Sequence, residues 1–131
     1  MNFEFIHIIL YVSNQENSTK FYSDLLNKKP ILQILGMTEF QLNNFTKLGL
    51  MPEKSIEKIV SDTMPNPNLA NGIPKCELYL FVDNVTKTFK KAIKLGAKEI
   101  NLPKDRDWND FVGYVSDFDG NILAFAKKNK N

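Results

Sequence analysis

Short apolar stretches alternate along the chain with amphipathic and polar ones. Residues 3–12 form an apolar run rich in Phe, Ile and Val, which predicts a β-strand. Apolar residues then recur every three or four positions, the spacing of an amphipathic helix, which Pro30 ends. Three further apolar segments follow at residues 31–35, 37–42 and 45–51. The first part of the chain therefore predicts the order β-α-β-β-β.

The same order returns after a stretch that breaks the pattern. Residues 52–74 hold four prolines and several asparagines, which predicts a linker, with a short helix at 53–60 near its start. Residues 76–82 then predict a strand, and a helix follows that Gly96 ends. Three more short strands are predicted at 98–102, 111–115 and 121–126.

The two parts repeat in sequence as well as in pattern. The segment IHIILYV at 6–12 aligns with CELYLFV at 76–82. Two such units indicate a duplicated module and not a solenoid, which requires at least three repeats. We therefore expect an α+β fold of two βαβββ modules in a single domain. Its expected parts are module 1 at 1–51, a linker at 52–74, module 2 at 75–126 and a tail at 127–131.

Strand alternation predicts which side chains share a surface. One face of each module's first strand is aliphatic, as expected for a face beneath a helix. The opposite face mixes a base, an acid and aromatic groups: His7, Ile9 and Tyr11 in one module and Glu77, Tyr79 and Phe81 in the other. Ala124 lies on that face if the residues directly before and after it in its strand point toward the helix. Mixed, aromatic-rich concave surfaces are typical of small-molecule sites.

Three residues attract attention through their type and place. Trp108, the only tryptophan, lies in a polar stretch that predicts a loop, where an indole can stack on a ligand or pack on a hairpin. His7, the only histidine, is more often structural than a ligand or base unless it has a partner. Glu77 stands at the repeat position of His7, which favours a shared cavity in which the two could form a hydrogen bond.

Four motifs in order resemble the glyoxalase/bleomycin-resistance/dioxygenase family, the vicinal oxygen chelate superfamily. They are IHxxLxV at 6–12, SxxFYxxLL at 18–26, ExxLxVDN at 77–84 and DFDGNxL at 117–123. The last differs from the family's D-P-D-G-N in having Phe118 in place of proline. The resemblance implies that the two modules form a partly closed mixed sheet around a cavity, with helices on its outer face. It also implies a homodimer, in which exposed sheet edges are covered.

Enzymes of this family hold a divalent metal with His or Glu at four strand positions, where it acts as a Lewis acid. The resemblance places His7 at the first position and Glu77 at the third, but Leu50 near the second and Ala124 at the fourth. Leu and Ala cannot bind a metal, and two ligands are too few for a catalytic zinc or a hard cation. We therefore expect no metal cofactor; the alternative is a divalent metal held by His7 and Glu77.

Composition limits the classes of partner. The 131 residues suit one domain, and 43% hydrophobic and 24% charged residues are near globular averages. A net charge of +2 is too weak to argue for nucleic acid. The single cysteine, Cys76, fits a reducing cytoplasm, and no apolar run approaches the roughly 18 residues of a membrane span. We expect a cytoplasmic protein that binds neither nucleic acid nor membrane.

Three functions fit these observations. The first is metal-independent binding of a small organic molecule, as in the bleomycin-resistance branch. The second is a metal-dependent lyase, isomerase or dioxygenase whose missing ligands come from Glu53, Asp105, Asp107 or a partner subunit. The third is a degenerate module used for protein–protein contact. We favour the first and leave catalysis open, with no catalytic residue assigned; the ligand-binding residues are then His7, Tyr11, Leu50, Glu77, Tyr79, Trp108 and Ala124.

Overall fold

The computed structural model describes residues 1–130, which form two compact units divided between Asn71 and Gly72. The elements of unit 1 are β1 (Ile6–Val12), α1 (Gln15–Leu26), β2 (Leu32–Ile34), β3 (Met37–Asn43), β4 (Thr46–Pro52), α2 (Glu53–Val60) and the 3-10 helix η1 (Pro67–Ala70). Those of unit 2 are β5 (Glu77–Phe81), α3 (Val85–Lys94), β6 (Lys98–Asp105), β7 (Asp110–Ser116) and β8 (Ile122–Lys128). The predicted α+β fold of two βαβββ modules is confirmed.

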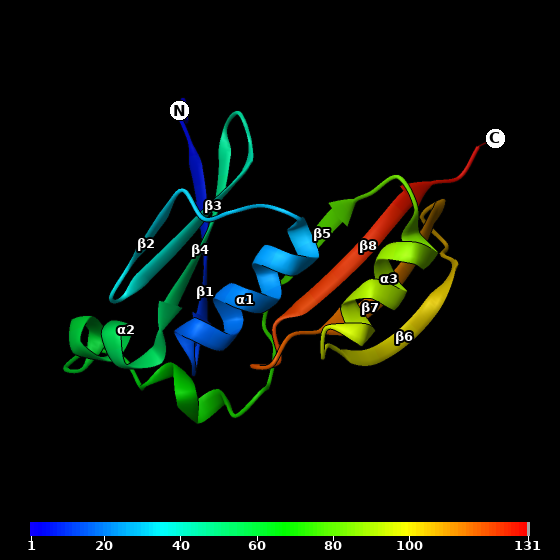
Figure 1. Ribbon diagram of the computed structural model, residues 1–131. Helices are drawn as coiled ribbons and strands as arrows, with labels where there is room; N and C mark the ends of the chain where they lie inside the picture. The colour runs from blue at the N-terminus through cyan, green and yellow to red at the C-terminus, as the bar shows by residue number, and fades with distance from the viewer. Residues whose placement is uncertain (131) are drawn as a thin grey trace. The chain divides into compact units, whose positions relative to one another are not determined.

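Each unit holds one four-stranded mixed sheet, and neither sheet closes into a barrel. The strand order is β1-β4-β3-β2 in unit 1 and β5-β8-β7-β6 in unit 2. In each sheet the first and the last strand along the chain pair in parallel, β1 with β4 and β5 with β8. The other strand pairs are antiparallel. One helix crosses each sheet, α1 in unit 1 and α3 in unit 2 (Figure 1).

The two helices begin in the same way. Asn14 and Asn84 stand before α1 and α3 in extended backbone, and each side-chain oxygen accepts a hydrogen bond of 2.9 Å from the backbone N–H three residues on. Both helices end at a residue with positive φ, but the residue type differs: it is Asn27 after α1 and Gly96 after α3. Local sequence therefore sets where both helices begin and end.

The cores lie between each helix and its sheet. Alternate residues of the paired strands supply one apolar layer, and the helices supply the other. The buried residues of unit 1 include Leu10, Val12, Phe21, Tyr22, Phe40, Leu48 and Leu50. Those of unit 2 include Leu78, Val85, Phe89, Val115, Leu123 and Phe125.

Several element bounds differ from those predicted. The first strand begins at Ile6 and not at residue 3, and β2 covers only three of the five residues predicted. β6 continues to Asp105, three residues past the predicted end, with irregular pairing to β7. The helix predicted at 53–60 is confirmed as α2. No helix among the described residues is long and apolar enough to cross a membrane.

Candidate functional site

The face of each sheet turned away from α1 or α3 carries most of the predicted site residues; we call it the far face. In unit 1 the strand register pairs His7 with Lys47, Ile9 with Gly49 and Tyr11 with Met51, so these six residues share it. In unit 2 the register pairs Tyr79 with Ala124, Tyr114 with Ala124, Phe81 with Ala126 and Asp110 with Lys128. The two far faces are described separately.

In unit 2, Ala124 lies at the base of a tyrosine-lined surface. It is fully buried and forms an apolar cluster with Val112 and Ala126. Tyr79 and Tyr114 pack against this cluster and stay partly buried themselves. Ala124 is therefore covered by aromatic rings from both neighbouring strands.

A chain of hydrogen bonds joins the predicted residues Tyr79 and Trp108 to a carboxylate. The Trp108 indole N–H donates to the Tyr79 phenol oxygen at 2.8 Å, and the Tyr79 hydroxyl donates to Oδ2 of Asp110 at 2.7 Å. Asp110 is only 4% exposed. Its Oδ1 is buried without a hydrogen bond, and Nζ of Lys128 lies 3.6 Å from it. The network fixes the tyrosine ring against the buried acid.

Asp110 is a site residue that sequence reasoning missed. The strand predicted at 111–115 begins one residue too late, because β7 starts at Asp110. By alternation, Asp110 lies on the same face as Val112 and Tyr114. Extending the predicted strand by one residue would have placed this acid on the face of Tyr114, although not beside Tyr79.

Burial raises the pKa of both tyrosines above the usual 10.0. For Tyr79, the hydrogen bond donated to Asp110 and the negative charge of Asp110 raise the pKa further, while the hydrogen bond from Trp108 lowers it. For Tyr114, the charge of Glu77 raises the pKa and that of Arg106 lowers it. The Arg106 guanidinium lies 5.0 Å from the centre of the Tyr114 ring. Both phenols are therefore neutral at physiological pH.

In unit 1, the far face is built around Gly49. The His7 ring lies over this glycine so closely that an added Cβ would stand 2.5 Å from Nε2. Beside it, Nζ of Lys47 lies 3.4 Å from Oε1 of Glu39 and 5.9 Å from the centre of the Phe5 ring. Glu39 pairs with Gly49 and so shares its face.

Leu50 is placed on the other side of this sheet. It pairs with Leu10, is fully buried and belongs to the layer beneath α1. Gly49, and not Leu50, is the β4 residue beside His7. Tyr11, by contrast, stands on the His7 face as predicted from alternation. Of the predicted residues, His7 and Tyr11 share one far face, and Glu77, Tyr79 and Ala124 share the other, with Trp108 bonded to Tyr79.

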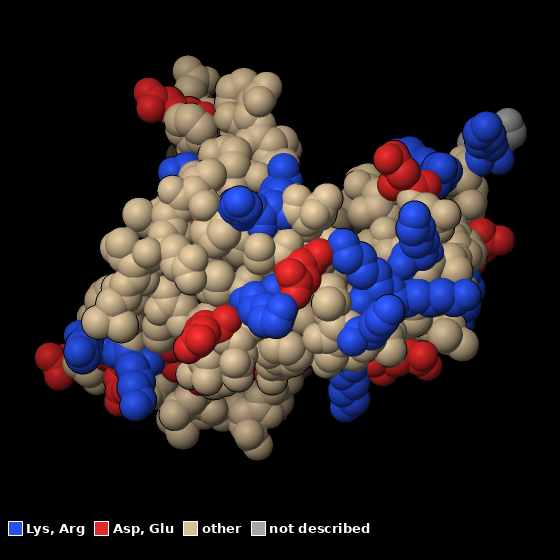
Figure 2. Space-filling view, viewed as in Figure 1, with Lys and Arg blue, Asp and Glu red and all other residues tan. Residues whose placement is uncertain are grey.

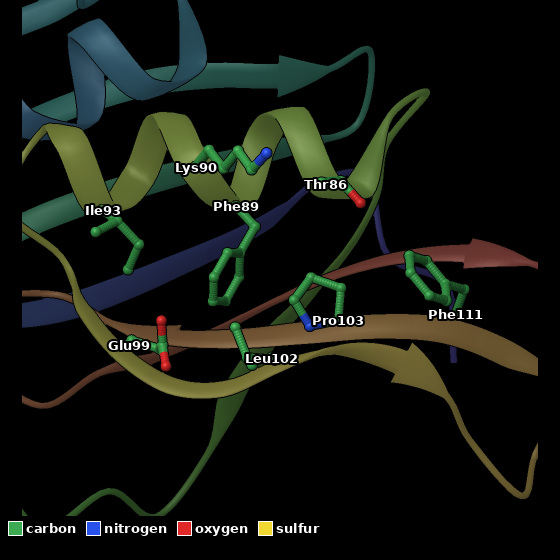
Figure 3. A pocket seen from close by; sticks show the side chains of 8 residues that line it. All are labelled: Thr86, Phe89, Lys90, Ile93, Glu99, Leu102, Pro103 and Phe111. Carbon is green, nitrogen blue, oxygen red and sulfur yellow. The ribbon is translucent and has the colours of Figure 1, made fainter.

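A separate groove of about 420 Å³ lies on the helix side of unit 2. In Figure 3, Phe89 and Ile93 extend from α3 toward Leu102 and Pro103 of β6. The other lining residues are Thr86, Lys90, Glu99 and Phe111. No predicted ligand-binding residue lines this groove. Figure 2 shows lysines gathered on the same side, where α3 carries Lys87, Lys90, Lys91 and Lys94.

Sequence comparison identifies the family. The family model of the Glyoxalase-like domain matches residues 5–128. The chain belongs to this family. No curated protein matches it.

Solved structures share the fold of this glyoxalase-like domain. A glyoxalase-related enzyme from Fulvimarina pelagi has a TM-score of 0.79 at 20% identity, over 92% of this chain and 85% of its own. A glyoxalase/bleomycin resistance protein/dioxygenase family enzyme from Burkholderia phytofirmans PsJN has a TM-score of 0.75 at 14% identity, over 92% and 94%. A protein from Agrobacterium tumefaciens solved by NMR has 0.75 at 24% identity, over 99% of both chains. At these identities the likeness shows the fold alone.

The residues of this glyoxalase-like domain do not fit the family's four-ligand metal. His7 and Glu77 carry donor atoms, but Gly49 of β4 and Ala124 of β8, which pair with Ile9 and Tyr79 on the far faces, have no side-chain donor atom. Among residues 1–130, no group of three or more His, Cys, Asp or Glu residues gathers to hold a metal. Of the alternative ligands, Asp105 accepts a hydrogen bond from the Asn129 amide at 3.0 Å.

Proposed function

We propose that this glyoxalase-like domain binds a small organic molecule on the far face of unit 2, without a catalytic metal. The observation that carries the proposal is the Trp108–Tyr79–Asp110 network above the small residues Ala124 and Ala126. It joins aromatic surface, hydrogen-bonding groups and a buried charge on one face. Sites for small molecules combine these features.

The exposed aromatic side chains support binding at this face. Trp108 is 55% exposed and Phe81 is 57% exposed, although both lie beside the buried Asp110 network. Large apolar side chains that gather at the surface around polar groups mark ligand or protein contacts. Since Tyr79 both donates and accepts a hydrogen bond, its ring is held in place before any ligand arrives, which lowers the entropy lost on binding.

The side chains at the metal positions support binding without metal chemistry. A Lewis acid in this family requires donors on the strands equivalent to β4 and β8. Gly49 and Ala124 supply none, and the Ala124 methyl is buried beneath two tyrosines. The structural relatives include a glyoxalase-related enzyme and a glyoxalase/bleomycin resistance protein, so the fold is compatible with both catalysis and binding.

Binding is tested by screening a small-molecule library with Trp108 fluorescence and melting temperature as readouts. A ligand at 100 times its Kd adds about 2.7 kcal/mol of apparent stability. We expect Tyr79→Phe to weaken the ligands found, because Tyr79 anchors both Trp108 and Asp110. Leu102→Ser, in the groove beside α3, is the matched control and should leave affinity unchanged. Ligands lost with Leu102→Ser but kept with Tyr79→Phe would move the site to that groove.

A separate experiment tests the proposal that the ligand is bound without a metal. Zinc, nickel, manganese and ferrous iron are titrated by calorimetry into protein purified without a metal-affinity tag. We expect no stoichiometric binding, because too few donors are present. Tight binding that His7→Ala abolishes would overturn this part and favour the family's metal-dependent enzymes.

We also propose that the protein is a homodimer. The outermost strands, β1 and β2 in unit 1 and β5 and β6 in unit 2, have one unpaired edge each within their sheets. Exposed strand edges favour association, and a second copy can cover them. Sedimentation at micromolar concentration checks this, and a single monomeric species would contradict it.

A further inference from the structure

The Lys128 ammonium lies against the far face of unit 2 between an acid and an aromatic ring. Lys128 is the last residue of β8, and its side chain is 77% exposed. Its Nζ lies 3.6 Å from Oδ1 of Asp110 and 5.4 Å from the centre of the Phe81 ring. An exposed side chain thus places a positive charge near a buried carboxylate.

The carboxylate has one oxygen ready for a further donor. Oδ2 of Asp110 accepts the Tyr79 hydroxyl, but Oδ1 is buried and accepts no hydrogen bond. At 3.6 Å, Lys128 neutralises the charge without forming a hydrogen bond. A buried acceptor without a donor is costly, so a closer N–H donor would stabilise it.

Aromatic residues are linked to this carboxylate and to Lys128. Tyr79 and Phe81 stand edge to face with centroids 5.4 Å apart, and Trp108 is bonded to the Tyr79 hydroxyl. Aromatic faces attract organic cations, and aromatic cages are the common means of recognising ammonium groups. A buried carboxylate beside three aromatic residues provides both the charge and the rings that such a group requires.

We propose that Asp110, Phe81, Tyr79 and Trp108 form a site for the ammonium group of an organic cation, and that Lys128 occupies this site in the free protein. The inference rests on the proposed binding function and names its ligand class. An exposed lysine holds such a place weakly, because ordering its long chain offsets the ion-pair energy. A ligand whose ammonium sits on a rigid aromatic body loses less entropy and displaces it.

Removing the internal ammonium tests the proposal. The probes are benzylamine, which is a cation at neutral pH, neutral benzyl alcohol and anionic benzoate, each followed by Trp108 fluorescence and melting temperature. We expect benzylamine to bind roughly five- to tenfold more tightly to Lys128→Met than to the wild type, since the competing ammonium is gone. Affinity for benzyl alcohol should stay within about twofold.

Two variants separate local from general charge effects. Lys127→Met changes the net charge equally, but Lys127 instead donates to the backbone carbonyl of Asp83, so benzylamine affinity should not rise. Asp110→Asn keeps the size and one acceptor oxygen, and should weaken benzylamine at least about tenfold. Circular dichroism checks its folding; if it does not fold, Phe81→Leu replaces it, with a loss of about threefold expected.

The outcomes distinguish the cation from the binding function. The cation proposal is overturned if benzylamine binds Lys128→Met no better than Lys127→Met, or if benzyl alcohol or benzoate binds the wild type more tightly than benzylamine. In those cases small-molecule binding still stands. If neither these probes nor any library compound binds the wild type or Lys128→Met, the binding function itself is wrong as well.

Discussion

The two units share a framework but not a surface. Gly49 in unit 1 and Ala124 in unit 2 pair with equivalent positions of the first strand, Ile9 and Tyr79. The His7 ring stands over Gly49, whereas Ala124 is closed over by tyrosines. The same position in the same sheet order thus supports an imidazole in one unit and an aromatic, acid-linked surface in the other.

The helix sides of the sheets differ much less. Both units bury aliphatic and aromatic residues beneath the helix, and both helices start at an asparagine with the same cap hydrogen bond. Burial of apolar area stabilises each unit, so these positions must stay apolar for the chain to fold. The side chains that differ in chemistry between the units lie instead on the far faces.

The largest expected effect on stability tests whether the apolar cores beneath the two helices contribute equally to the free energy of unfolding. Phe40→Ala and Phe125→Ala each remove a ring that is fully or almost fully buried, one in each unit. Each should lower the free energy of unfolding by about 3–5 kcal/mol. Urea denaturation measures the loss, with the exposed Phe45→Ala as the control. A loss below 1 kcal/mol in one unit only, on the order of a surface change, would show that the units do not share one type of core.

The sequence predicts this framework well because its signals are local. Alternating apolar residues, the caps at Asn14 and Asn84 and the glycine at Gly96 each act within one or two turns of chain. The helix α2 differs, since it begins directly after Pro52 and has no side-chain cap hydrogen bond. The DFDGN segment also acts locally: Oδ1 of Asp117 accepts from the N–H groups of Asp119 and Asn121 at 2.9 Å, which holds the turn before β8.

The far faces were predicted less well because they depend on long-range register. The pairing of Ile9 with Gly49 joins strands separated by a helix and two other strands, and it decides that Gly49 and not Leu50 lies beside His7. Asp110 enters the network through a hydrogen bond to Tyr79, 31 residues earlier. Both the residues that face each other across a sheet and the distant hydrogen-bond partner of a tyrosine hydroxyl depend on how separate strands pair. A local sequence pattern does not predict that pairing. Whether the two far faces share a cavity stays a prediction.

The next effect compares the two small positions directly. Ala124→Leu adds atoms at a fully buried site between Tyr79 and Tyr114 and should cost about 1–3 kcal/mol of unfolding free energy. Gly49→Ala meets the tip of the His7 ring, which can rotate away, so it should cost under about 1 kcal/mol. The His7 ring resonances should shift in NMR spectra of Gly49→Ala. Equal costs would contradict the difference between the two faces.

A smaller effect isolates the hydrogen-bond network of unit 2. Tyr79→Phe removes the donor to Asp110 and the acceptor for Trp108, and should cost about 1–2 kcal/mol because a buried carboxylate oxygen loses its partner. Trp108 emission should also change, since its indole N–H loses the phenol. Tyr114→Phe on the same face is the control for losing a hydroxyl and should leave Trp108 emission as it is. Unchanged emission in Tyr79→Phe would contradict the network.

The smallest effect is a dependence of stability on alkaline pH that comes from the far face of unit 2. Because the folded pKa values of Tyr79 and Tyr114 lie above the ordinary 10.0, both phenols keep their protons in the folded chain at a pH where the unfolded chain has lost them. Their contribution to the free energy of unfolding is therefore complete below about pH 10. It is lost as the pH rises through the raised pKa values of the folded chain.

Urea denaturation at intervals from about pH 8 to about pH 11 measures this loss, and tyrosinate absorbance follows the phenols themselves. Lysines also titrate in this range, so the informative quantity is the difference between variants and wild type. The double variant Tyr79→Phe/Tyr114→Phe should lose stability less steeply above about pH 10, and each single variant should lie between it and the wild type. If the double variant is as steep as the wild type, the two tyrosines do not couple their protons to folding, and the far face of unit 2 is more hydrated than its packing on Ala124 implies.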